Sequence, residues 1–140
     1  MRSAGRSGPG IPHLWRPRRE SHLWEIPQAE GLGFSVEAID AGNVGFHLHG
    51  TLGNGPKKLL LVGHYDTVFP TGTTKERPFS RKDDYAFGPG IYDMKGGLVN
   101  FYMALRSLKE LNLLPRDKTI EFFFNCDEEA GSGTSKDHII

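Results

Sequence analysis

Three short polar clusters in this sequence combine the side-chain types that bind metal ions and move protons. They comprise His64 with Asp66, Asp93 within the glycine-rich stretch 88–97, and the acidic run Asp127-Glu128-Glu129. One imidazole and several carboxylates, without a set of thiolates, suit zinc, manganese or cobalt in a hydrolytic site. Paired metals bridged by a carboxylate activate a shared water and polarise a carbonyl, while a free carboxylate moves the proton. Together the clusters indicate metal-assisted hydrolysis.

The first cluster follows an apolar run. If extended geometry continues to position 66, the side chains of His64 and Asp66 point the same way. His64 could then bind a metal, while Asp66 accepts a hydrogen bond from the other ring nitrogen or orients a neighbouring group. The alternative is a hydrogen-bonded pair of loop residues.

The second cluster surrounds Asp93, which stands directly before a helical period. Helix capping is the alternative to a metal role, because an aspartate at this position can bond to free backbone N–H groups. Gly96 and Gly97 in the first helical turns cost roughly 1 kcal/mol each relative to alanine. We therefore expect a packed strand or a ligand site to approach this backbone closely.

The third cluster, residues 127–129, follows a predicted strand. A solvated acidic turn is the alternative here. Three carboxylates beside a buried strand end repel one another, and a bound cation would relieve that repulsion. Glu128 and Glu129 could divide metal binding and proton transfer between them.

The elements that must position these clusters follow from hydrophobic periodicity. Residues 33–39 and 44–52 alternate and predict half-exposed strands, whereas the continuous run 59–63 predicts a strand buried on both faces. Residues 70–90 read as a loop, a helical period from Met94 stops at Pro115, and residues 119–124 form another strand. A strand, a helix and a second strand make a β-α-β unit, so the fold class is α/β, with a mixed or mostly parallel sheet covered by helices. The polar clusters fall at strand ends or at a helix start, where ligands bind in such sheets.

The composition allows one domain. Residues 1–25 predict a disordered arm, and residues 26–140 predict the domain. Hydrophobic residues make up 37% and charged residues 24% of the chain. Seventeen basic and seventeen acidic residues cancel, which argues against nucleic acid and membrane partners. One cysteine, Cys126, and the lack of a secretory signal favour the cytoplasm. His47 and His49 alternate with apolar residues and are interpreted as the polar face of a strand.

The three clusters, taken in order and with their spacing, resemble a family of zinc metallopeptidases. The strings Val62-Gly63-His64-Tyr65-Asp66-Thr67-Val68, Gly88-Pro89-Gly90-Ile91-Tyr92-Asp93-Met94-Lys95-Gly96-Gly97 and Asn125-Cys126-Asp127-Glu128-Glu129 look like those of carboxypeptidase G, aminoacylase and succinyl-diaminopimelate desuccinylase. The loop between the first two strings looks most like the glutamate carboxypeptidase branch.

The resemblance implies a role for each matched position. His64 would bind one zinc, Asp66 would orient that histidine, and Asp93 would bridge both metals. A cis peptide often follows the bridging aspartate in the family, here between Asp93 and Met94. Glu128 would be the general base, and Glu129 would bind the second zinc. Two Zn²⁺ ions would occupy a complete site, with Co²⁺ or Mn²⁺ possible.

The resemblance also implies what the parent protein does. It would be a metal-dependent carboxypeptidase or amidohydrolase acting on peptides or N-acyl amino acids such as acyl-glutamates. One further ligand for each zinc and a small dimerisation or lid domain are expected beyond position 140, so a homodimer is expected for the full-length protein. The alternative is that this chain is a catalytically inactive truncated fragment, acting at most as a metal-binding or interaction module.

Overall fold

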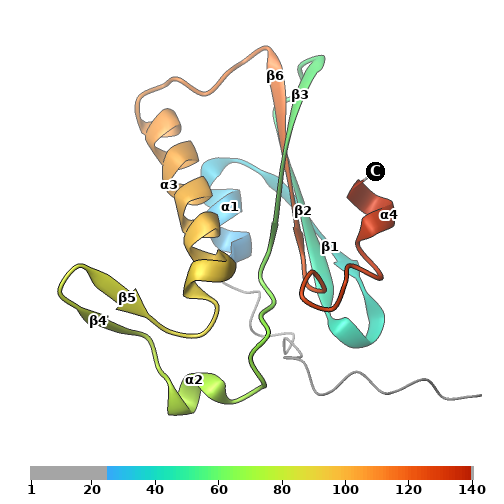
Figure 1. Cartoon of the computed structure of the whole chain (residues 1–140). Coiled ribbons are helices and arrows are strands. Elements are labelled where there is room, and N and C mark those ends of the chain that lie inside the picture. The colour runs from blue at the N-terminus through green and yellow to red at the C-terminus, as the bar shows by residue number, and fades with distance from the viewer. Residues whose placement is uncertain (1–24, 140) are drawn as a thin grey trace, which may run out of the picture.

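The computed structural model describes residues 25–139 of the chain (Figure 1). The predicted arm, residues 1–25, lies outside these described residues except for Glu25, which begins the first helix. In chain order the elements are α1 (Glu25–Leu32), β1 (Ser35–Asp40), η1 (Gly42–Val44), β2 (Phe46–Leu52), β3 (Lys57–His64), α2 (Thr73–Glu76), β4 (Ser80–Lys82), β5 (Tyr85–Phe87), η2 (Ile91–Lys95), α3 (Gly96–Glu110), β6 (Lys118–Asn125) and α4 (Lys136–Ile139). Within this part of the chain, no helix is long and apolar enough to cross a membrane.

A four-stranded sheet in the order β1-β2-β6-β3 forms the centre of the fold. β3 and β6 run parallel and are joined through α3, so the predicted β-α-β unit is present. β1 pairs with β2, and β2 pairs with β6, both in antiparallel fashion. The predicted α/β class with a mixed sheet is confirmed.

Helices α1 and α3 cover one face of the sheet (Figure 1). Phenylalanine side chains form the core there because alternate residues of β6 point toward these helices. The rings of Phe122 and Phe124 stack with centroids 4.5 Å apart, and Phe101 of α3 meets both edge-on. Phe34 completes the group, and its ring centroid lies 5.2 Å from that of Phe122.

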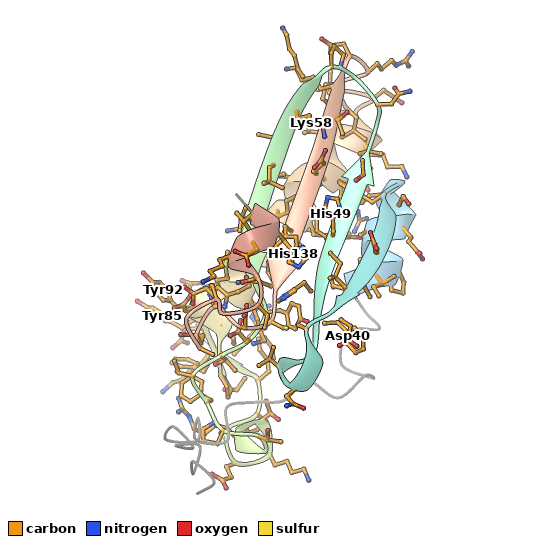
Figure 2. The ribbon with its side chains drawn as sticks, turned by 90° about the vertical axis from the view of Figure 1, so that its right-hand side faces the viewer. Asp40, His49, Lys58, Tyr85, Tyr92 and His138 are labelled. Atoms are coloured by element: carbon orange, nitrogen blue, oxygen red, sulfur yellow. The ribbon has the colours of Figure 1, made fainter. Side chains whose placement is uncertain are left out.

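The opposite face of the sheet carries α4, a short helix that the sequence did not predict. His138 of α4 stacks on Phe123 with ring centroids 5.8 Å apart. Figure 2 looks onto this face, where His138 lies near α4 and His49 and Lys58 follow farther along the sheet. His47 and His49 do belong to this face, but His47 is only 1% exposed. Both histidines thus lie on one face of the strand as interpreted from the sequence, but the burial of His47 was not foreseen, because the chain after β6 folds back over it.

β3 is an edge strand, in contrast to the prediction of a strand buried on both faces. Among the described residues it pairs with β6 alone. Leu59, Leu60 and Val62 are 52%, 42% and 48% exposed, respectively. The continuous apolar run correctly predicted a strand, but no described segment covers the outer edge of that strand.

Residues 25–32 and 70–90 also contain elements that were not predicted. Residues 70–90, expected as a loop, contain α2 and the β4-β5 hairpin, whose two linking residues include Asp83 at φ 53°. α1 was missed because Pro27 and Gly31 suggest a break. Proline is tolerated in a first helical turn, where its missing N–H would have no helical partner.

Candidate metal centre

The parallel pairing of β3 with β6 brings the first and third clusters together. His64 ends β3 and lies opposite Asn125, which ends β6. Both strands therefore deliver their carboxyl ends to the same edge of the sheet, and the acidic run continues directly from β6. This rim is the expected place for ligands in a sheet of this kind.

His64 is the centre of the cluster. Its ring is buried, with 7% of the side chain exposed. Its Nε2 lies 3.0 Å from Oδ1 of Asp93 and 3.8 Å from Oε2 of Glu128. The carboxylates reach the ring from the solvent side, since the side chains of Asp93 and Glu128 are 66% and 51% exposed.

The other ring nitrogen of His64 faces Asp66. Nδ1 lies 3.2 Å from Oδ1 of Asp66, although the geometry falls short of a hydrogen bond, and neither atom has another hydrogen-bond partner among the described residues. Oδ2 of Asp66 accepts a hydrogen bond of 3.0 Å from the backbone N–H of Glu129. Asp66 thus stands between the imidazole and the acidic turn, as a carboxylate that orients a metal-binding histidine does.

The donor atoms are close enough to share a cation. One ligand atom each from His64, Glu128 and Glu129 lie within 4.8 Å of one another. Asp93 adjoins this group through its 3.0 Å contact with His64. Neighbouring ligands of a tetrahedral zinc at 2.0–2.1 Å lie about 3.3 Å apart, so donor atoms separated by up to 4.8 Å would have to move closer together to coordinate an ion. The imidazole and carboxylate donor set fits a divalent transition metal.

Asp93 does not cap a helix. α3 begins at Gly96 after Lys95, and no side chain forms a capping hydrogen bond there. Asp93 has φ −119° and ψ 102°, outside the helical region, and the Asp93–Met94 peptide bond is cis, as the resemblance implied. The capping alternative is therefore wrong, and the carboxylate is left free to face His64.

The glycines near Asp93 serve local packing. A Cβ at Gly96 would lie 3.0 Å from the carbonyl oxygen of Ile91, and one at Gly97 would lie 3.0 Å from Cε of Met94. We expected a strand or a ligand to approach this backbone, but the close neighbours belong to the preceding turn. Gly90, with φ 71°, has the left-handed conformation that glycine adopts most readily.

Asp127 is the buried member of the acidic run, with 2% of the residue exposed. Its Oδ2 accepts hydrogen bonds of 2.7 Å from both the backbone N–H and the hydroxyl of Thr134. Burial alone would raise the pKa of Asp127, but hydrogen bonds from Ser135 and Thr134 outweigh it and lower the pKa. Asp127 therefore stabilises the turn through Thr134, and of the acidic run only Glu128 and Glu129 belong to the candidate donor group.

A buried network behind this turn was missed in the sequence. The N–H of Cys126 donates to Nδ1 of His47 at 3.3 Å, and Nε2 of His47 lies 3.1 Å from the Thr134 hydroxyl. Burial lowers the pKa of His47, which favours a neutral ring. Burial also raises the pKa of the Cys126 thiol to about 12, so this cysteine stays protonated. Strand alternation placed His47 on the correct face, but no pattern in the sequence predicted that the chain after β6 would cover this residue.

Comparisons with known proteins agree with this geometry. The model of the family "Peptidase family M20/M25/M40" matches residues 60–140. The chain is 41% identical over 116 residues to carboxypeptidase G2 from a Pseudomonas species, an alignment that covers 80% of this chain and 28% of that protein. It is 36% identical over 101 residues to acetylornithine deacetylase from Vibrio campbellii, covering 70% of this chain and 26% of that protein.

The fold also matches a solved structure. Human carnosine dipeptidase 1 superposes with a TM-score of 0.71 at 20% identity, over 85% of this chain and 28% of that one. At this identity the likeness concerns the fold. The chain spans little more than a quarter of the length of each of these relatives.

Proposed function

The chain belongs to peptidase family M20/M25/M40, and on that premise we propose that the protein carrying it hydrolyses amide bonds with the help of divalent metal ions. The proposed reaction is that of a carboxypeptidase acting on peptides or N-acyl amino acids such as acyl-glutamates. The observation that supports it is the convergence of His64, Glu128 and Glu129 within 4.8 Å at the rim of the sheet, with Asp93 beside them.

The matched residues divide the work as follows in this proposal. His64 and Glu129 would each hold one metal ion, and Asp93 would be shared between the two. Asp66 keeps the His64 ring in place, because it lies against Nδ1 and leaves Nε2 for the ion. When bound, two zinc ions would activate a water and polarise the scissile carbonyl.

Glu128 carries the proton transfer. Its carboxylate is half exposed at the open side of the centre, 3.8 Å from Nε2 of His64, where a substrate would enter. It accepts a proton from the attacking water and donates it to the leaving amine. The release of a free amine and a free carboxylate completes the hydrolysis.

Zinc titration calorimetry of the purified chain tests the metal centre. We expect zinc binding that weakens at least about tenfold in Asp93→Ala, because the bridging carboxylate is lost. Asp84→Ala is the matched control, since Asp84 is an exposed aspartate in the turn between β4 and β5. Equal zinc affinity in the wild type and both variants would rule out this metal centre.

A second experiment tests the reaction. The protein carrying this chain should release glutamate from an acyl-glutamate, lose that activity with a chelator and regain it with zinc. Activity that a chelator leaves untouched would contradict the proposal.

The alternative is a chain that binds metal without hydrolysing anything. Two observations favour it for the 140-residue chain alone: the exposure of Asp93, at 66%, and the small number of donors. Two four-coordinate zinc ions need more ligands than His64, Asp93 and Glu129 provide, so water or further protein donors must complete each shell. Zinc binding without glutamate release would support this alternative.

A further inference from the structure

Glu128 and Glu129 lie on a turn, and their own side chains are not packed firmly enough to hold that turn in place. Glu128 is exposed and Glu129 is only partly buried. Hydrogen bonds inside the turn, from the N–H of Gly131 to the carbonyl of Glu128 and from the N–H of Ser132 to the carbonyl of Asp127, fix its local shape. They do not fix where the turn sits relative to the sheet.

A directed chain of hydrogen bonds ties the turn to β2. The N–H of Cys126 donates to Nδ1 of His47, so the ring proton is on Nε2. Nε2–H then donates to the Thr134 hydroxyl at 3.1 Å, and that hydroxyl donates to Oδ2 of Asp127 at 2.7 Å. The N–H of Thr134 also donates to Oδ2 of Asp127 at 2.7 Å, and the chain ends on the residue directly before Glu128.

We infer that His47 is a positioning residue of the metal centre: acting through Thr134 and Asp127, it holds the turn that presents Glu128 and Glu129 to His64. This inference rests on the proposed function. Asp66 holds the same turn from the β3 side, through the N–H of Glu129. Asn125 of β6 also holds this segment, because its side-chain amide donates to the Ser135 hydroxyl at 3.0 Å. The acidic pair is thus fixed from three strands.

Burial makes the connection sensitive to substitution. Thr134 is exposed, but His47 and Asp127 are only 1% and 2% exposed, so water cannot readily replace a lost partner at these two side chains. A buried donor or acceptor left without a partner is costly, and the turn would shift to satisfy it. A shift of the turn moves the two glutamates together.

The first test is zinc affinity in His47→Leu. Removing residues that orient metal ligands commonly weakens metal binding 10–100-fold, and we expect a loss of about tenfold or more. His47→Gln keeps a donor in place of Nε2 and should recover most of the affinity. His49→Leu is the matched control, because His49 lies on the same strand and face but pairs with Glu121, 3.5 Å away.

Thr134 supplies a second, independent variant. Thr134→Val removes the hydroxyl while keeping the shape and the N–H, and should weaken zinc binding as His47→Leu does. Thr134→Ser should preserve it. If His47 acts through Thr134, the double variant His47→Leu/Thr134→Val loses no more affinity than either single variant.

Amide hydrogen exchange measures the position of the turn without any metal. We expect the amides of Glu129 and Thr134 to exchange faster in His47→Leu and Thr134→Val, while the amide of Phe122 in the sheet is unchanged. Unchanged exchange at Glu129 together with unchanged zinc affinity in a folded variant would overturn the inference. Should His47→Leu fail to fold, the same comparison of Thr134→Val with Thr134→Ser decides the question.

The two proposals fail differently. Absence of zinc binding by the wild-type chain would count against the proposed metal centre, and the exchange rates would still decide whether His47 holds the turn. Normal zinc binding together with unchanged exchange at Glu129 in every folded His47 and Thr134 variant would overturn only the inference.

Discussion

At the residue scale, the neighbouring side chains Glu128 and Glu129 have different expected roles although both belong to the same donor group. Their oxygens and a nitrogen of His64 all lie within 4.8 Å of one another. Geometry alone therefore allows either glutamate to bind an ion. The resemblance separates them, giving Glu128 the proton and Glu129 the metal.

Paired amide substitutions distinguish these roles in the protein that carries the chain. Glu128→Gln should leave zinc binding nearly unchanged and lower kcat about 10²–10⁴-fold, because general base catalysis is lost. Glu129→Gln should weaken zinc binding instead. Metal titration and steady-state kinetics on the same samples provide the measurement, and the reverse pattern would exchange the two assignments.

His47 also predicts a pH dependence of stability. The pKa of His47 is lowered from its ordinary value, first by burial, and a second contribution comes from His138 of α4; Asp127 and Asp66 act in the opposite direction. The unfolded chain therefore binds a proton near pH 6.5 that the folded chain does not, and stability falls as the pH drops through this region toward the folded pKa.

Denaturation in urea at pH 7.5 and pH 5.5 measures this effect. We expect the wild-type chain to lose more stability between these two pH values than His47→Gln does, because glutamine does not titrate. The same loss in both proteins would show that groups other than His47 dominate the pH dependence.

The limits of the sequence at this scale are visible in particular residues. His64, Asp66, Asp93 and Glu128 form three ordered motifs, and the fold brings them to one rim of the sheet as the strand order required. The role of Asp127 was hidden because it depends on Thr134, whose position is set by a turn with no periodicity. Hydrogen bonds across an irregular turn leave no regular pattern in the sequence.

At the scale of elements, long segments with a regular hydrophobic pattern were predicted correctly, whereas short segments without such a pattern were missed. The helical period after Met94 and the apolar strand after Pro115 correspond to α3 and β6. The β4-β5 hairpin escaped notice because its strands have three residues each and are exposed throughout. Such short strands show neither alternation nor a buried run.

Packing between elements predicts a severe effect at Gly50 of β2. A Cβ at this position would lie 2.1 Å from Cε1 of Phe122, which packs in the centre of the core. Gly50→Ala should destabilise the fold by about 1–3 kcal/mol, as overpacking of a core does. The measurement is the free energy of unfolding in urea.

Gly31→Ala is the matched control for this prediction. No atom lies within 4 Å of a Cβ added at Gly31 in α1, so this substitution should stabilise by about 0.4–1 kcal/mol. Equal stability of the two variants would mean that the Phe122 ring moves aside without cost.

At the scale of the whole molecule, the outer edge of β3 is an exposed apolar edge that no other described strand pairs with. One side of the strand is hydrogen-bonded to β6, and on the other no described strand follows. Leu59, Leu60 and Val62 are about half exposed along it. An apolar strand with a free edge is a template for pairing with another chain.

We therefore expect the 140-residue chain to self-associate as its concentration rises. Val62→Lys should reduce the association, since a charged lysine on an edge strand opposes strand pairing. Leu111→Lys is the matched control, because Leu111 is an equally apolar residue, 66% exposed, just after α3 and away from the edge. Sedimentation velocity across a concentration series measures the result. If Val62→Lys and Leu111→Lys reduce association equally, general hydrophobicity is responsible and the free edge of β3 is not the contact.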